Sequence, residues 1–191
     1  MSKKLRVEQE INKNIYVHND IANAAHHLSS RIESNKINGI EEGISLDIMS
    51  CLIMLAFEFE AKVNFIGHMK IKEWNERDNF HNKTKTIYKS LKLNLIKDSR
   101  PYKTILTLKD YRDSIAHGKP LHINKNEIIE LLNNERNPDV DLENSFYDLC
   151  TIEFMRECKE DIDKIWNEWL TAANIEIQET FTHGSFSTTV L

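Results

Sequence analysis

The sequence is poor in the residues that interrupt helices. Its 191 residues include only five glycines and three prolines, and no stretch rich in glycine or serine divides it. Hydrophobic residues make up 40% and charged residues 29%, a composition that disfavours both disorder and an all-β fold. We therefore expect one helix-rich domain, and a chain of this length can bury a core large enough to need no disulfide or metal.

Cysteines and long apolar runs are equally scarce. The three cysteines, Cys51, Cys150 and Cys158, include no close pair at the spacing of metal ligands, and Cys51 lies in an apolar run where a buried thiol is expected. The longest charge-free apolar run, residues 48–57, is half the length of a membrane span, and the polar start lacks the apolar segment of a signal peptide. We predict a soluble cytoplasmic protein.

The usual motifs of cofactor and metal enzymes are also missing. The chain has no nucleotide-binding loop, no HExxH, no CxxC and no GxSxG. We therefore predict no cofactor and no metal.

Charge is present but unevenly distributed. The net charge is −5, yet residues 62–125 hold 15 basic and 6 acidic side chains, whereas residues 126–191 hold 4 and 15. The basic segment could attract a polyanion, or the two segments could pack together and offset one another. Charge alone leaves both possibilities open.

Apolar residues recur at helical spacing along most of the chain. This pattern predicts helices over residues 5–35, 45–71, 80–97, 101–118 and 146–173, with a possible short helix at 126–132 and a loop at 133–145. The second helix is apolar on almost every side up to Phe57, which is typical of the central helix of a bundle. The third carries a face of lysines, for which a solvated surface is the simplest interpretation. We predict an all-α bundle of four to five helices in a single domain, residues 1–175, with a polar tail at 176–191.

The segment YRDSIAHGKP, residues 111–120, ends the fourth of these helices. Gly118 and Pro120 are typical of a helix end. Arg112 and His117 are five positions apart, about 7.5 Å of rise and about 140° of rotation, so they cannot share one helix face. Asp113 and His117 are at the neighbour spacing of four, so the carboxylate could fix the tautomer of the imidazole and raise its basicity.

This segment resembles the signature of the HEPN superfamily. That signature is an Arg, a polar residue, three further positions and a His, often followed by Gly, at the end of a bundle helix. In this chain it is Arg112, Asp113, residues 114–116, His117 and Gly118. The order of helices over residues 5–173 is similar as well, although the specific part is only six residues long.

The resemblance implies a homodimer in which two motif copies face each other across one cleft. Many members of the family are metal-independent ribonucleases that act as toxins or antiphage effectors, some of them held in check by an antitoxin or other partner protein. By this resemblance His117 would be the acid/base, Arg112 would hold the scissile phosphate of RNA, and Asp113 would orient the His. Lys109 and Lys119 would bind substrate, although one toxin branch has a Tyr at the position of Lys119.

An accessory role is predicted for Glu58, with Glu60 as the neighbouring candidate, because both carboxylates stand where the apolar second helix becomes amphipathic.

Two other interpretations remain open. A HEPN-type bundle can bind a protein or nucleotide without cleaving anything. Alternatively, an unrelated bundle could use Arg112 in an ion pair, with Asp110 or with a carboxylate of the acidic last helix, while His117 caps a helix end. Ion pairs of Arg112 within one chain would favour this last reading, and a polar cleft shared by two chains would favour a ribonuclease.

Overall fold

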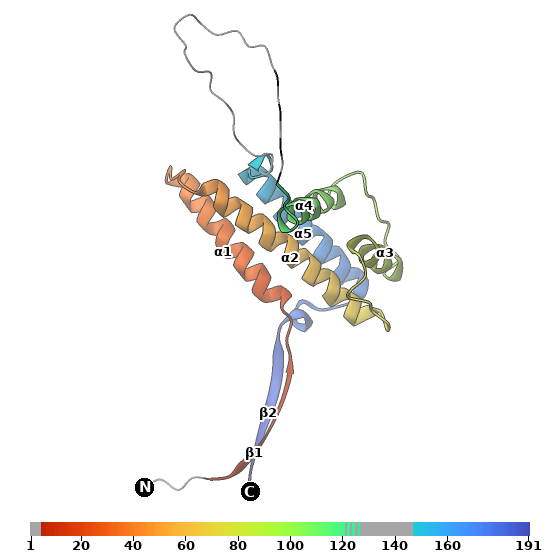
Figure 1. The fold of residues 1–191 in the computed structure, drawn as a ribbon. Helices are drawn as coiled ribbons and strands as arrows, with labels where there is room; N and C mark the ends of the chain where they lie inside the picture. Colours follow the sequence, from red (N-terminus) through yellow and green to blue (C-terminus); the bar gives the residue numbers. More distant parts are fainter. Residues whose placement is uncertain (1–4, 121, 123, 125, 127–146) are drawn as a thin grey trace, which may run out of the picture.

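The computed structural model describes residues 5–120, 122, 124, 126 and 147–191. The predicted helix at 126–132 and the loop at 133–145 therefore lie outside the described residues. The described part holds five α-helices, one 3-10 turn and two strands (Figure 1): β1 Val7–Asn14, α1 His18–Ile37, α2 Ile44–Lys70, α3 Phe80–Ser90, α4 Tyr102–Ala116, α5 Ile152–Ala173, η2 Ile177–Thr180 and β2 His183–Val190.

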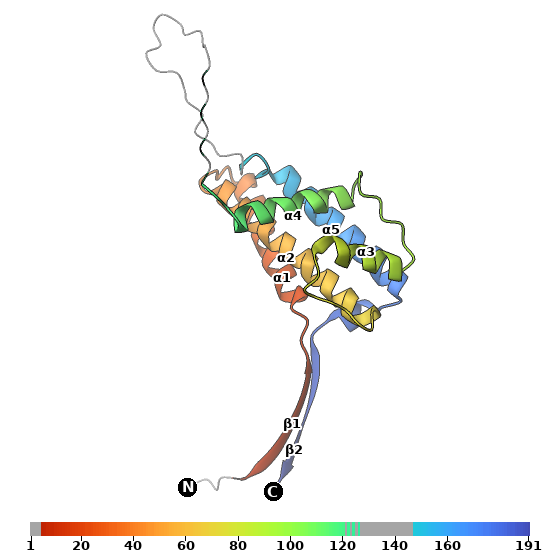
Figure 2. The ribbon, with the colours of Figure 1, turned by 45° about the vertical axis from the view of Figure 1, so that its right-hand side comes forward.

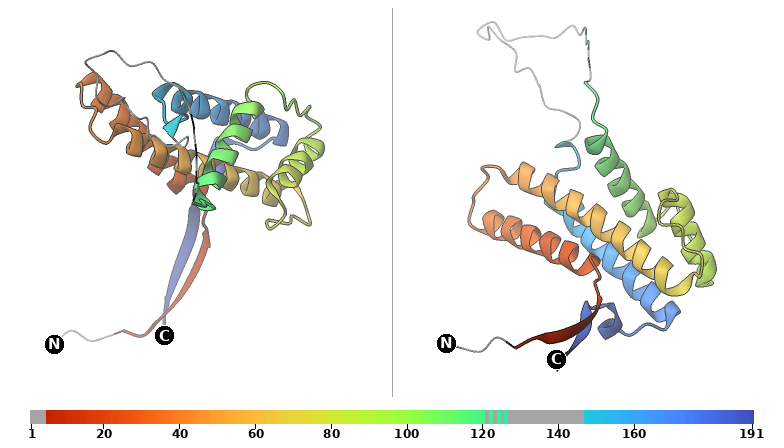
Figure 3. Two further views of the ribbon diagram at one scale, coloured as in Figure 1. Left: turned by 45° about the horizontal axis from the view of Figure 1, so that its top comes forward. Right: turned by 60° about the horizontal axis from the view of Figure 1, so that its bottom comes forward.

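Helix α2 is the centre of the bundle, as its apolar sequence predicts. It contacts α1, α3, α4 and α5, and its side chains Leu52, Phe59 and Val63 are at most 2% exposed. Trp169 of α5 is fully buried against it, with its ring 5.4 Å from that of Phe59. Figure 3 shows α1, α2 and α5 lying side by side, while α3 and α4 cover another face of α2 and α5. The prediction of an all-α bundle of four to five helices is confirmed in part: five helices form the bundle in the described residues, but the structure also has a two-stranded sheet.

The first predicted helix begins later than its apolar spacing suggests. Residues 7–14, expected to be helical, form β1, and α1 starts at His18. The reason is a partner that no local pattern reveals: β1 pairs in antiparallel register with β2, which comes from the predicted polar tail. The two strands form a ribbon that projects away from the helices, with Val7 and Val190 at its far end (Figure 2).

Gly184 allows these two strands to approach each other. A Cβ atom built on Gly184 would lie 2.6 Å from the backbone oxygen of Asn12, which is too close for any other residue without a shift of the backbone.

The third helix ends at Ser90, earlier than the predicted residue 97. Lys92 adopts a left-handed conformation with φ 57°, and the N–H of Leu93 donates to the carbonyl of Tyr88 at 2.9 Å. These features are typical of a helix C-terminus. Leu91 at the C-cap, and Leu93 and Leu95 in the connection that follows, pack against the core.

The last helix starts at Ile152 rather than at Phe146. Thr151 caps it, since its hydroxyl accepts a hydrogen bond from the N–H of Phe154 at 3.1 Å. None of the helices in the described residues is both long and apolar enough to span a membrane.

Candidate functional site

Helix α4 places the motif at its exposed end. Tyr102, Ile105, Leu108 and Tyr111 recur every three residues and are buried against the bundle. The helix ends as predicted: the N–H of His117 donates to the carbonyl of Asp113 at 2.9 Å, and His117 is the C-terminal cap. The residues that follow are exposed, so the motif leaves the bundle at this point.

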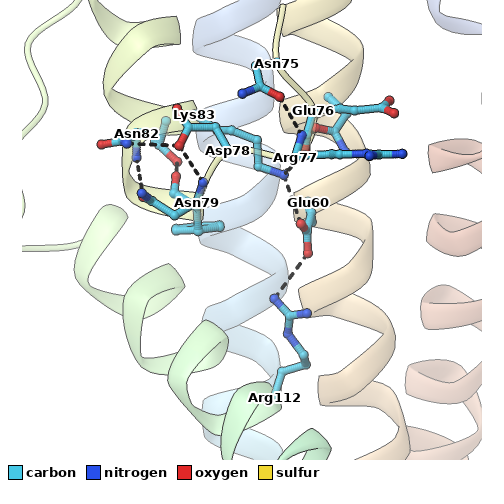
Figure 4. Close-up of polar contacts among 12 residues, drawn as sticks. Glu60, Asn75, Glu76, Arg77, Asp78, Asn79, Asn82, Lys83 and Arg112 are labelled. Atoms are coloured by element: carbon cyan, nitrogen blue, oxygen red, sulfur yellow. Dashed lines mark hydrogen bonds and ion pairs between the residues drawn. The ribbon is translucent and has the colours of Figure 1, made fainter.

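Arg112 points from α4 toward α2, as Figure 4 shows. Its Nη2 donates to Oε2 of Glu60 at 3.2 Å, and its Cζ lies 5.6 Å from the centre of the Phe57 ring. The side chain is 20% exposed. Within the described part of the chain, Nη1 has no hydrogen-bond partner, so one edge of the guanidinium can still bind an anion.

Glu60 connects Arg112 to a second cation, Lys83 of α3. Lys83 Nζ lies 3.0 Å from Glu60 Oε1, and it also donates to Asn64 at 3.3 Å and to the carbonyl of Glu76 at 3.4 Å. The Lys83 side chain is only 2% exposed. Glu60 therefore bridges two cations and joins α2, α3 and α4 (Figure 4).

Asp113 lies beside Arg112 and Lys109. Its Oδ1 is 3.0 Å from Arg112 Nε, although this contact is not a hydrogen bond and Nε has no acceptor among the described residues. Its Oδ2 is 2.9 Å from Lys109 Nζ. Hydrogen bonds to Asp113 and then Asp110 raise the pKa of Lys109 above its usual value, so this amine stays charged. The predicted contact between Asp113 and the His117 ring is not made in this conformation.

His117 stands apart from the other motif residues. Its side chain is exposed at the end of α4, and among the described residues its imidazole has no hydrogen-bond partner. Lys119 is likewise exposed beyond the helix end. The structure thus brings together Arg112, Asp113 and Lys109, whereas the side chains of His117 and Lys119 are exposed and make no hydrogen bond or ion pair with any of these three.

The two candidate carboxylates of α2 have separate roles. Glu58 is 6% exposed and accepts a hydrogen bond from Lys62, four residues along the helix, at 2.5 Å. The pair lines a different cavity, of about 310 Å³, beside His18 and Trp166. Glu58 is therefore a core residue on the far side of α2, and Glu60 is the carboxylate at the motif.

Lys83 is the site residue that sequence reasoning missed. It belongs to the row of lysines on α3 that was expected to be solvated, and it is instead buried. Its position four residues before the buried Ile87, at the edge of the apolar stripe of α3, is the signal that separates it from its exposed neighbour Lys85. Its burial depends on Glu60 and Asn64, which come from another helix.

One chain by itself offers little room at Arg112. The hollow that Arg112 and Lys109 line, with Phe59 and Phe80, has a volume of about 10 Å³, roughly enough for one water molecule. A nucleotide would therefore have to bind over the surface of α4 or between this surface and a second chain.

The described residues offer no metal site, and comparison with known proteins finds no match. No group of three or more His, Cys, Asp or Glu side chains in the described residues is placed to hold a metal ion. No protein-family model, curated protein or solved structure matches the chain.

Proposed function

We propose that this protein is a metal-independent endoribonuclease of the HEPN type. The observation that carries the proposal is the state of the motif. Arg112 is held in place by Glu60, and within the described residues neither its Nη1 nor the exposed imidazole of His117 has a hydrogen-bond partner. An oriented Arg and an accessible imidazole are what phosphodiester cleavage in RNA requires.

The two side chains would divide the chemistry between them. The imidazole of His117 would take the proton of the 2'-hydroxyl or give a proton to the leaving 5' oxygen, worth roughly 10² to 10⁴ in rate. The free edge of Arg112 would donate hydrogen bonds to a non-bridging phosphate oxygen and stabilise the charge that grows on it. RNA supplies its own nucleophile, so the expected product is a 2',3'-cyclic phosphate.

The site would be completed by a second copy of the chain. Arg112 points toward α2, His117 stands free at the helix end, and the hollow at Arg112 is small. Two α4 ends facing each other would place the His of each copy near the Arg of the other. Lys109 and Lys119 would then contact phosphates that flank the cleaved bond.

The biological setting follows from the resemblance alone. A toxin or antiphage effector in the cytoplasm would need restraint, so a regulatory or antitoxin protein is the expected partner beside RNA.

A second candidate is a bundle of this kind that binds a protein or nucleotide without cleaving RNA. The ion pair between Arg112 and Glu60 is compatible with it, because a carboxylate already neutralises the guanidinium within one chain. The same ion pair is the observation that favours an unrelated bundle, in which Arg112 serves only to join α4 to α2.

Cleavage of a mixed RNA substrate in excess EDTA separates these candidates. The unaltered protein should cleave, and His117→Ala and Arg112→Ala should each abolish cleavage. His27→Ala and Arg6→Ala are matched controls, since both residues are exposed and lie elsewhere. Equal cleavage by His117→Ala would exclude the assigned role of His117, and no cleavage by any variant would favour the binding module.

A further inference from the structure

The ribbon of β1 and β2 has one apolar face that nothing in the described chain covers. Directly opposed pairs in its register include Val7 with Val190 and Ile11 with Phe186. Opposed residues share a face of the sheet, so all four side chains lie on one side. They are 48%, 62%, 50% and 76% exposed, in that order. A ribbon of two strands is at best marginally stable alone in water, so this one is expected to pair further.

The register also determines which backbone groups are free. The N–H of Leu191 donates to the carbonyl of Arg6 at 3.0 Å, so these two residues form a hydrogen-bonded pair. Hydrogen-bonded and non-hydrogen-bonded pairs alternate along an antiparallel ladder. The N–H and C=O groups that point outward from β2 are therefore those of Gly184, Phe186, Thr188 and Val190. The residues with free backbone groups are thus the ones on the apolar face.

The two edges of the ribbon differ in charge. Strand β1 carries Glu8, Glu10 and Lys13, whereas β2, with the sequence HGSFSTTV, has no charged residue apart from a histidine and no proline. Charged residues and proline are the usual protection of an edge strand against pairing. Antiparallel pairing of β1 with another β1 in the register that pairs all four of its outward residues would oppose Glu10 to Glu10 of the other copy, which is destabilising. The edge of β2 is the one open to a further strand.

We propose that β2 pairs edge to edge with β2 of a second copy of this chain, in antiparallel orientation about a twofold axis at Ser187. This register opposes Gly184 to Val190 of the other copy and Phe186 to Thr188. The outward backbone groups of all four residues in each copy are then hydrogen-bonded to the other copy. The apolar faces of the two ribbons lie on the same side of the combined sheet. The ribbon becomes one four-stranded sheet.

The proposed arrangement is sterically open and adds an aromatic contact. Each ribbon joins its helices at the end near Asn14 and His183, so antiparallel pairing puts the two bundles at opposite ends of the sheet. Phe186 of each copy lies diagonal to its equivalent, at a spacing of about 7–8 Å that aromatic side chains can reach across. The end of α4 stays free, so this assembly does not depend on the proposed ribonuclease activity.

Proline substitutions test whether the ribbon pairs through the edge of β2 or through the edge of β1. Thr188→Pro removes one outward N–H of β2, and Gln9→Pro removes the outward N–H of the directly opposed residue of β1; neither breaks a bond between β1 and β2. The mass of the full chain, measured by light scattering, should be halved by Thr188→Pro and unchanged by Gln9→Pro. A monomeric parent protein, or equal effects of the two substitutions, would overturn the proposal.

A disulfide tests the register directly. In the proposed register, Ser187 lies on the twofold axis and is opposed to Ser187 of the second copy in a non-hydrogen-bonded pair. The Cα atoms of such a pair are about 4.5 Å apart, a distance that a disulfide can bridge. Since Cys51, Cys150 and Cys158 are buried, Ser187→Cys should give a covalent dimer under mild oxidation, and Ser185→Cys should not. A Ser185→Cys dimer forming as readily would rule out this register. RNA cleavage by the same variants reports separately on the proposed function.

Discussion

Glu60 Oε2 lies 3.2 Å from Arg112 Nη2, so the carboxylate of the central helix determines how the arginine of the motif helix is presented. The same carboxylate neutralises the buried Lys83. Stability of the bundle and geometry of the motif therefore share one residue.

Glu60→Gln should destabilise the bundle. Lys83 would keep its contacts with Asn64 and the Glu76 carbonyl but lose the carboxylate that neutralises its buried charge. We expect a loss of about 1–3 kcal/mol in the free energy of unfolding, measured by urea denaturation. Glu42→Gln, at an exposed position, is the control. An unfolding free energy unchanged by Glu60→Gln would show that Lys83 does not need this carboxylate.

His18 should make the fold sensitive to mild acid. Burial, and then the nearby charge of Lys62, lower the pKa of His18 from 6.5 to about 4. His18 takes up a proton below about pH 6.5 in the unfolded chain but only below about pH 4 in the folded chain. The neutral His18 therefore contributes its full share of the unfolding free energy above pH 6.5, and this share is lost as the pH falls toward 4. The difference between the two pKa values of His18 corresponds to a change of about 3 kcal/mol at most in the free energy of unfolding.

His18→Phe removes this titration and should flatten the dependence of unfolding free energy on pH between 6.5 and 4. The same change at the exposed His27 is the control. A slope that His18→Phe leaves intact would assign the acid sensitivity to other groups.

Arg100 and Arg156 offer a matched comparison of two bidentate ion pairs. Arg100 donates to Asp161 at 2.8 and 3.1 Å, and Arg156 to Glu33 at 2.7 and 2.6 Å. Asp161 is 3% exposed, whereas the Glu33 side chain is 33% exposed. Arg100→Ala leaves a buried carboxylate without its cation, so it should lower the melting temperature more than Arg156→Ala does. Equal effects would contradict this.

Gly184→Ala should open the ribbon while leaving the helices folded. The added methyl group would collide with the Asn12 backbone oxygen, and none of the 16 strand residues, eight in each strand, is part of the helical core. We expect faster amide hydrogen exchange in β1 and β2 and little change in helix α2. Ser185→Ala is the control, and slow exchange in Gly184→Ala would show that the strands can separate slightly and still pair.

The sequence predicted best what depends on neighbours in the chain. The central helix α2 and the end of α4 follow from apolar spacing and from Gly118, and both lie where expected. The errors fall where distant segments decide the outcome. Residues 7–14 form a strand because β2 pairs with them, and the buried amine of Lys83 is neutralised by Glu60, which comes from another helix. Similarly, spacing on one helix could suggest that Asp113 meets His117, but Lys109 lies at the same spacing on its other side.

The pairing of β1 with β2 also sets an order of events during synthesis. Asn14 and His183 are neighbours in the ribbon although 169 residues separate them in the chain. While ribosomes translate the message, β1 emerges long before its partner strand exists, and the helices between them can fold in the meantime. The ribbon can therefore close only after all five described helices have been synthesised.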